Sequence, residues 1–157
     1  MNVSLNGQPL QGVETERYEN LKMVVSYKDD AGNLIDVTSL KQGTDFIAEV
    51  TVEHPGILFY YNDLALSQIF PSGWEIINTR VQDVNSGIRE DAFDYRDYRD
   101  DRVYTFFKLR HYDKKTFRVR LNAAYTGRYY LPAVNCEAMY EDKIHANSKG
   151  RWVEVVR

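Results

Sequence analysis

Hydrophobic and polar positions alternate with a period of two along much of the chain. From Asp45 to Glu53 every second residue is apolar, and most residues between them are polar or charged. The same alternation runs over residues 116–124. Because successive side chains of a strand point to opposite faces, this period predicts strands rather than helices. Both segments are typical of antiparallel strands with one face in the core and one in solvent.

Other segments rich in Val, Ile, Tyr and Phe predict further strands. They cover residues 21–27, 34–38, 58–70, 74–79, 102–109, 128–140 and 151–157. Turn-forming residues such as Pro55-Gly56 and Pro71-Ser72-Gly73 separate several of these runs. A single helical turn over residues 64–69 is the one open alternative. The pattern therefore predicts an all-β, antiparallel β-sandwich with little helix.

Residues 89–102, with the sequence REDAFDYRDYRDDR, break this pattern. Arginines and acidic residues alternate there with three aromatic residues, between two strand signals. We expect a long loop that leads into the next strand. Such a charge run is usually solvated and paired within itself. As a docking loop it would use Tyr and Arg, the residue types that anchor interfaces, and the residues alone leave both interpretations open.

Composition restricts the class of protein. The 157 residues suffice for one domain, or one domain with an extra arm, and 43% of them are hydrophobic. The net charge of −3 gives no sign of the basic surface that nucleic-acid binding requires. No stretch approaches the roughly 18 apolar residues of a membrane span, and no signal peptide is visible at the start.

The sequence offers little catalytic or metal-binding chemistry. The single cysteine, Cys136, excludes an intramolecular disulfide and lies in an apolar run, where we expect a buried structural thiol. His54, His111 and His145 lack the spacing of metal ligands. Nucleophile elbows and phosphate-binding glycine loops are absent. We therefore expect no catalytic residue, no cofactor and no metal.

Two other functions stay open at this stage. The aromatic clusters at residues 59–61 and 129–130 could stack on sugars in a carbohydrate-binding or adhesin module, although alternating aromatics in a sandwich more often belong to the core. A small hydrolase could use paired carboxylates between Glu90 and Asp101 if they lay in a concave pocket.

Three stretches of the sequence, taken in order, resemble a known family. They are LALSQIFPSGWEII (64–77), FDYRDYRDDRVYTFFKL (93–109) and GRYYLPAVNCEAMY (127–140), the last followed by NSKGRWVEVV (147–156). Together they resemble the C-terminal macroglobulin-like domain of bacterial α2-macroglobulins, and residues 21–52 resemble the entry to that domain. The resemblance covers about residues 20–157, so residues 1–19 would be a linker or the tail of a preceding region.

The resemblance implies a role in defence against foreign proteinases. Members of the family are large periplasmic proteins that resemble the animal proteinase traps and are usually lipid-anchored through a distant N-terminus. A proteinase cuts a bait region, and an internal thioester then captures the attacker. The C-x-E-Q motif of the thioester domain is absent from this chain. The resemblance therefore implies a non-catalytic domain in the periplasm or cell envelope, whose parent inhibits proteinases.

The partner implied by the resemblance is the thioester domain of the same parent chain. In the family, a tyrosine of the last macroglobulin-like domain helps to shield the thioester, and Tyr95 is our candidate here, with Tyr98 slightly behind. The whole predicted docking loop comprises Tyr95, Arg96, Asp97, Tyr98, Arg99, Asp100, Asp101 and Arg102.

Overall fold

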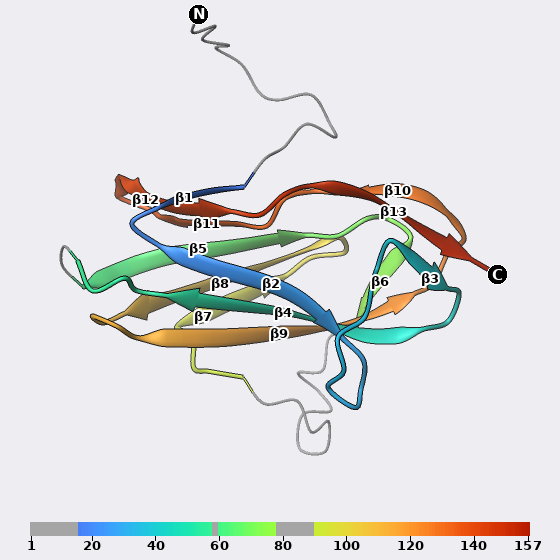
Figure 1. Ribbon diagram of the computed structural model, residues 1–157. Coiled ribbons are helices and arrows are strands. Elements are labelled where there is room, and N and C mark those ends of the chain that lie inside the picture. Colours follow the sequence, from blue (N-terminus) through green and yellow to red (C-terminus); the bar gives the residue numbers. More distant parts are fainter. Residues whose placement is uncertain (1–15, 58–59, 78–89) are drawn as a thin grey trace, which may run out of the picture.

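The computed structural model describes residues 16–57, 60–77 and 90–157 (Figure 1). These residues form strands and turns and contain no helix. None of them forms a helix that is long and apolar enough to cross a membrane. The strands are β1 (Arg17–Glu19), β2 (Lys22–Lys28), β3 (Ser39–Lys41), β4 (Asp45–Glu53), β5 (Tyr61–Ile69), β6 (Trp74–Ile77), β7 (Tyr95–Tyr98), β8 (Arg102–Leu109), β9 (Lys114–Ala123), β10 (Gly127–Leu131), β11 (Asn135–Ala138), β12 (Glu141–Asn147) and β13 (Arg151–Val156).

The strands form three sheets arranged as a sandwich (Figure 1). A six-stranded sheet has the order β1-β12-β11-β5-β8-β7, a four-stranded sheet the order β2-β4-β9-β6, and a three-stranded sheet the order β10-β13-β3. Among the described strands every pair is antiparallel except β13 and β3, which are parallel. The predicted all-β, antiparallel sandwich is confirmed.

The four-stranded sheet contributes to two apolar clusters. Toward one end, Val50 and Phe117 pack with residues of the six-stranded sheet such as Leu66 and Phe107. Toward the other end, Phe46 and Leu121 pack with residues that include those of the three-stranded sheet. The period of two explains this layering, because the inward residues of β4 and β9 are those that the alternation singled out.

The prediction of one strand over residues 128–140 is wrong. β10 and β11 belong to different sheets, and Pro132 lies between them. Proline has no N–H to donate to a ladder, so the chain leaves the three-stranded sheet at this point and crosses to the six-stranded sheet. The possible helical turn at 64–69 is a strand, because those residues belong to β5.

Three other segments differ from expectation. Residues 34–38 form an isolated bridge at Leu34 and a turn in which Asp36 Oδ1 accepts the Thr38 N–H at 2.9 Å, and β3 follows. The expected loop 89–102 contains β7, whose pairing with β8 the charge pattern concealed. Within the expected linker 1–19, Arg17–Glu19 form β1 at the edge of the six-stranded sheet; residues 1–15 lie outside the described residues.

Candidate functional site

The charged segment, which we define as residues 90–102, contacts two sheets. Its first residues lie along β9 of the four-stranded sheet, where the Asp91 N–H donates to the Thr116 carbonyl at 3.0 Å. The Thr116 N–H donates back to Asp91 Oδ2 at 2.7 Å. Its next part, β7, is the outer strand of the six-stranded sheet and pairs with β8. The segment therefore links the two layers of the sandwich along one side.

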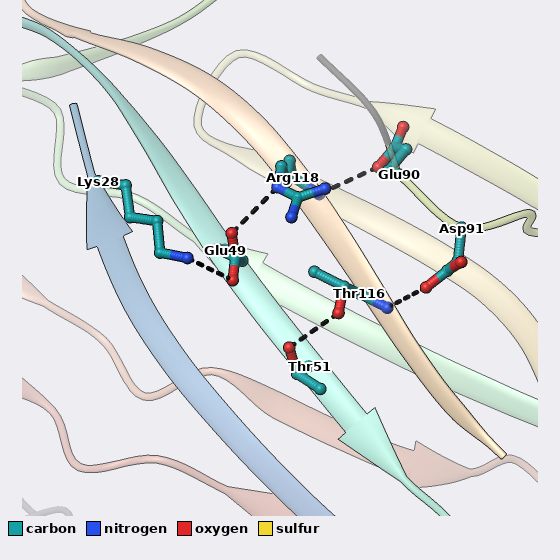
Figure 2. A network of polar contacts seen from close by, with 7 residues as sticks. All are labelled: Lys28, Glu49, Thr51, Glu90, Asp91, Thr116 and Arg118. Atoms are coloured by element: carbon teal, nitrogen blue, oxygen red, sulfur yellow. Dashed lines mark hydrogen bonds and ion pairs between the residues drawn. The ribbon is translucent and has the colours of Figure 1, made fainter. Parts of the chain in front are cut away.

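A polar network on β4 and β9 holds the start of this segment (Figure 2). The Arg118 N–H donates to Glu90 Oε2 at 3.0 Å, and the Arg118 side chain donates to Glu49 Oε2, also at 3.0 Å. Lys28 donates to the other oxygen of Glu49 at 3.0 Å. Burial alone would raise the pKa of Glu49, but these two cations outweigh it and lower that pKa.

Arg96 is the centre of the segment and is buried, with 1% of its surface exposed. Its Nη1 and Nη2 donate to the two oxygens of Glu90 at 2.6 and 2.9 Å, which is a bidentate pair. Its Nε donates to Thr105 Oγ1 on β8 at 3.0 Å, and Nη1 also donates to the Tyr98 hydroxyl at 3.3 Å. Because Glu90 also accepts the Arg118 N–H, one carboxylate connects β7 to β9.

The surroundings of Arg96 explain why a charge is tolerated there. Its guanidinium carbon lies 4.2 Å from the centre of the Phe93 ring, a cation–π distance. Burial by itself lowers the pKa of Arg96, but the hydrogen bonds and charge of Glu90 raise it above its ordinary value. Arg96 is therefore a fixed cation that positions the segment, and its side chain is not available as a docking contact.

The two candidate tyrosines differ in exposure. Tyr95 is 59% exposed and stacks on Phe106, with the ring centres 5.9 Å apart. Tyr98 is half-buried, packs against the second apolar cluster and accepts a hydrogen bond from Arg96. Of these two tyrosines, only Tyr95 offers a broad ring surface to a partner.

The remaining charges of the segment form local pairs. Arg99 donates to Asp97 at 3.1 Å, and its side chain is 64% exposed. Asp101 and Arg102 form a bidentate pair at 2.9 and 3.0 Å, and the charge-assisted hydrogen bond from Arg102 lowers the pKa of Asp101. The Arg99 N–H donates to the Arg102 carbonyl at 2.8 Å and so closes the turn that presents Asp100 to solvent.

Sequence reasoning missed the residues that hold the segment in place. Glu90, Phe93 and Thr105 were not among the predicted docking residues, although all three contact Arg96. Tyr95 and Tyr98, residues of high strand propensity, were the available signal for a strand. The buried position between them is Arg96, so no alternation of apolar and polar residues marks the strand.

The structure also describes the carboxylates, the potential metal ligands and the cysteine that the sequence offered for other chemistry. Glu90, Asp97 and Asp101 are each paired with an arginine, which argues against paired catalytic carboxylates. Among the described residues no group of three or more His, Cys, Asp or Glu could hold a metal ion. Cys136 is buried, as predicted, and burial raises the pKa of its thiol.

The aromatic clusters do not form a sugar-stacking row on the described surface. Tyr61 and Tyr130 are buried, Tyr129 is half-buried, Tyr60 is 53% exposed, and Phe59 lies outside the described residues. Trp152 is 44% exposed, but Arg128 lies over its ring at 4.9 Å. Burial of most of these rings counts against the carbohydrate-binding alternative.

Comparison with known proteins identifies relatives of this chain. Residues 18–143 match the family model of the bacterial alpha-2-macroglobulin MG10 domain. An alpha-2-macroglobulin homolog of Yersinia pestis is 24% identical over 170 residues, which cover 95% of this chain and 8% of that protein. This chain therefore corresponds to a small part of that curated relative.

Two solved structures share the fold. Salmonella alpha-2-macroglobulin reacted with methylamine matches with a TM-score of 0.81 and 21% identity, over 96% of this chain and 10% of that chain. Native Escherichia coli alpha-2-macroglobulin, from domain MG7 to the C-terminus, matches with a TM-score of 0.80 and 17% identity, over 97% of this chain and 25% of that chain. Because the family model covers most of the sequence, the chain belongs to the family of bacterial α2-macroglobulin MG10 domains.

Proposed function

We propose that this chain is a non-catalytic docking domain of a larger α2-macroglobulin-like proteinase inhibitor in the periplasm or cell envelope. Its partner is the thioester domain of the same parent, and the parent traps foreign proteinases. Membership of the MG10 family and the small share of the Yersinia relative that the chain covers support a role inside a larger protein. In this role the domain binds and shields, and the reactive chemistry belongs to the parent's thioester domain.

The exposure of Tyr95 on a rigid support carries the proposal. The ring lies on an edge strand, stacks on Phe106, and is followed directly by the buried Arg96. An aromatic ring held in place before docking loses little conformational entropy on binding and can exclude water over a large area. Those are the properties that a cover over a hydrolysable thioester requires.

The charges beside Tyr95 suit a reversible contact. Arg99 and Asp100 are exposed at the turn between β7 and β8, where they can form pairs with a partner. Exposed pairs of this kind contribute little free energy each but fix the orientation of docking. Cleavage elsewhere in the parent would release the contact as a two-state undocking.

A binding titration of this domain against the parent's thioester domain tests the proposal. Tyr95→Ala should weaken binding about tenfold or more, since a central aromatic anchor commonly carries that much. Tyr98→Ala should weaken it less. Tyr125→Ala, an exposed tyrosine on another loop, is the matched control and should bind like the wild type. Equal affinities for all variants would contradict docking through the charged segment.

A second measurement separates docking from shielding. In the full-length parent, Tyr95→Ala should accelerate spontaneous thioester hydrolysis and the incorporation of a small amine. Unchanged rates together with weakened binding would leave a docking surface and remove the shielding role.

A further inference from the structure

A concave site lies away from the charged segment, where β5 begins and the β11–β12 connection turns. It has a volume of about 170 Å³ and is lined by three tyrosines, two carboxylates and the buried Ile144. The tyrosines are Tyr60, Tyr61 and Tyr140, and the carboxylates are Asp63 and Glu141. No lysine or arginine is among the described lining residues.

Two irregular strand pairings form this site. Between Tyr61 and Leu64 the register of β5 with β8 shifts, so that Asn62 and Asp63 are both exposed on consecutive positions. A second shift, between Glu137 and Ala138, ends the regular pairing of β11 with β12. The Met139 N–H donates to the Asp63 carbonyl at 2.8 Å and joins the two irregular places. Shifts of this kind change the direction of side chains and are common beside functional sites.

The floor and one wall of the site are held in place. The Tyr61 hydroxyl donates to the Asn20 carbonyl at 2.7 Å, and the residue is buried. The Tyr60 ring packs edge-on against His111, with the ring centres 5.0 Å apart. Tyr140 is 82% exposed and forms the outer side. The site therefore combines a buried aromatic floor with an exposed aromatic rim.

Chemistry of this kind selects an organic cation. Tyrosine rings attract an ammonium group through their faces, and the carboxylates of the lining, Asp63 and Glu141, favour positive charge over neutral or negative groups. The apolar floor suits the methylene stem of a long side chain, which can lie on apolar surface while its charged end stays near solvent. We propose that this pocket binds the alkylammonium group of a lysine side chain presented by a partner protein.

The proposal is independent of the docking role of the charged segment. The pocket uses β5, β11 and β12, whereas the segment contains β7, which lies on the far side of β8 from β5 in the same sheet. Loss of one surface would leave the other intact.

NMR titration of the whole 157-residue chain with Nα-acetyl-lysine N-methylamide tests the site. We expect saturable shifts at the amides of Asn62, Asp63 and Glu141, with a dissociation constant in the millimolar range for this single side chain. The shifts should weaken as salt is added, because the carboxylates are near the surface. The same probe acetylated on its ε-nitrogen carries no charge and should produce no saturable shifts.

Matched variants assign the effect to the two carboxylates. Asp63→Asn combined with Glu141→Gln should weaken lysine binding by about fivefold or more, whereas Glu75→Gln, an exposed carboxylate on β6, should not. Unchanged dispersion of the spectra shows that the variants are folded. Equal response to the charged and acetylated probes, binding unaffected by the double substitution, or shifts confined to other parts of the chain would each overturn the proposal.

Discussion

At the scale of single residues, Arg96 shows how position decides the role of a charge. In the sequence it is one of several arginines in a charge run, and its exposed neighbours Arg99 and Asp100 fit that description. The pairing of β7 with β8 places Arg96 opposite Thr105, on an inward position, where Glu90 neutralises it. The same residue type is thus a structural cation at position 96 and a surface charge at position 99.

We expect Arg96→Ala to lower the free energy of unfolding by about 2–3 kcal/mol, because it leaves Glu90 without its partner and removes a contact between the layers. Arg96→Lys should recover only part of this, since an ammonium cannot form the bidentate pair. Urea unfolding followed by circular dichroism measures both. Arg99→Ala should change the stability by less than about 0.5 kcal/mol. An Arg96→Ala variant as stable as Arg99→Ala would show that the pair contributes nothing.

At the scale of elements, the turn before β6 depends on a close approach between two segments. The Gly73 carbonyl accepts the N–H groups of Ala124 and Tyr125 at 3.0 and 3.1 Å. A Cβ atom on Gly73 would overlap the ring of Tyr129. That ring is half-buried, and its hydroxyl donates to the carbonyls of Tyr125 and Thr126, so it cannot move away freely. Glycine is required at this position by space and not by backbone angles.

Gly73→Ala should therefore destabilise the domain by about 1–3 kcal/mol through overpacking. The loss of unfolding free energy caused by Gly73→Ala should be smaller when Tyr129 is also replaced by Ala. In a double-mutant cycle the double variant should therefore be more stable than the sum of the two single effects predicts. Gly32→Ala is the contrasting variant, because its φ of 87° is strained for alanine while nothing lies within 4 Å. Its cost, about 1 kcal/mol, should not depend on Tyr129. Additive effects of Gly73→Ala and Tyr129→Ala would contradict the steric explanation.

At the scale of the whole molecule, the four-stranded sheet connects the two apolar clusters of the sandwich. It contributes residues to both apolar clusters, and Val25 on β2 packs against each of them. Tyr27, at the end of the same strand, belongs to the second cluster and lies edge-on to Trp74. A change at Tyr27 should therefore affect the stability of the entire domain.

Alkaline pH should reveal this coupling. Burial raises the pKa of Tyr27 to about 12, although nearby Arg151 opposes the shift. A tyrosine whose pKa is raised in the folded state stabilises the fold fully below about pH 10, and that stabilisation is lost as the pH rises from about 10 to 12.

We therefore expect Tyr27→Phe to reduce the fall in unfolding free energy over this pH range by up to about 2 kcal/mol. Urea unfolding at pH 9, 10, 11 and 12 measures it, with Tyr125→Phe on the surface as the control. Identical pH curves for the two variants would show that Tyr27 does not titrate with unfolding.

Much of the architecture was predictable from local pattern. The alternation in β4 and β9 identified their inward faces, and the family resemblance agrees with the family model that matches residues 18–143. The candidate site was only partly predictable. Tyr95 and its neighbours were identified as a segment, but which of them face solvent depends on the pairing of β7 with β8.

The sequence by itself determined the class of fold and the strands with one wet face, because a period of two is a property of neighbouring residues. Only the tertiary structure decided that Glu90 joins β7 to β9, and that the chain changes sheets at Pro132. It also decided that Tyr60, Asp63 and Glu141 share one pocket. These arrangements bring together residues far apart in the chain, and their partners are set by strand order and register, which no local pattern encodes.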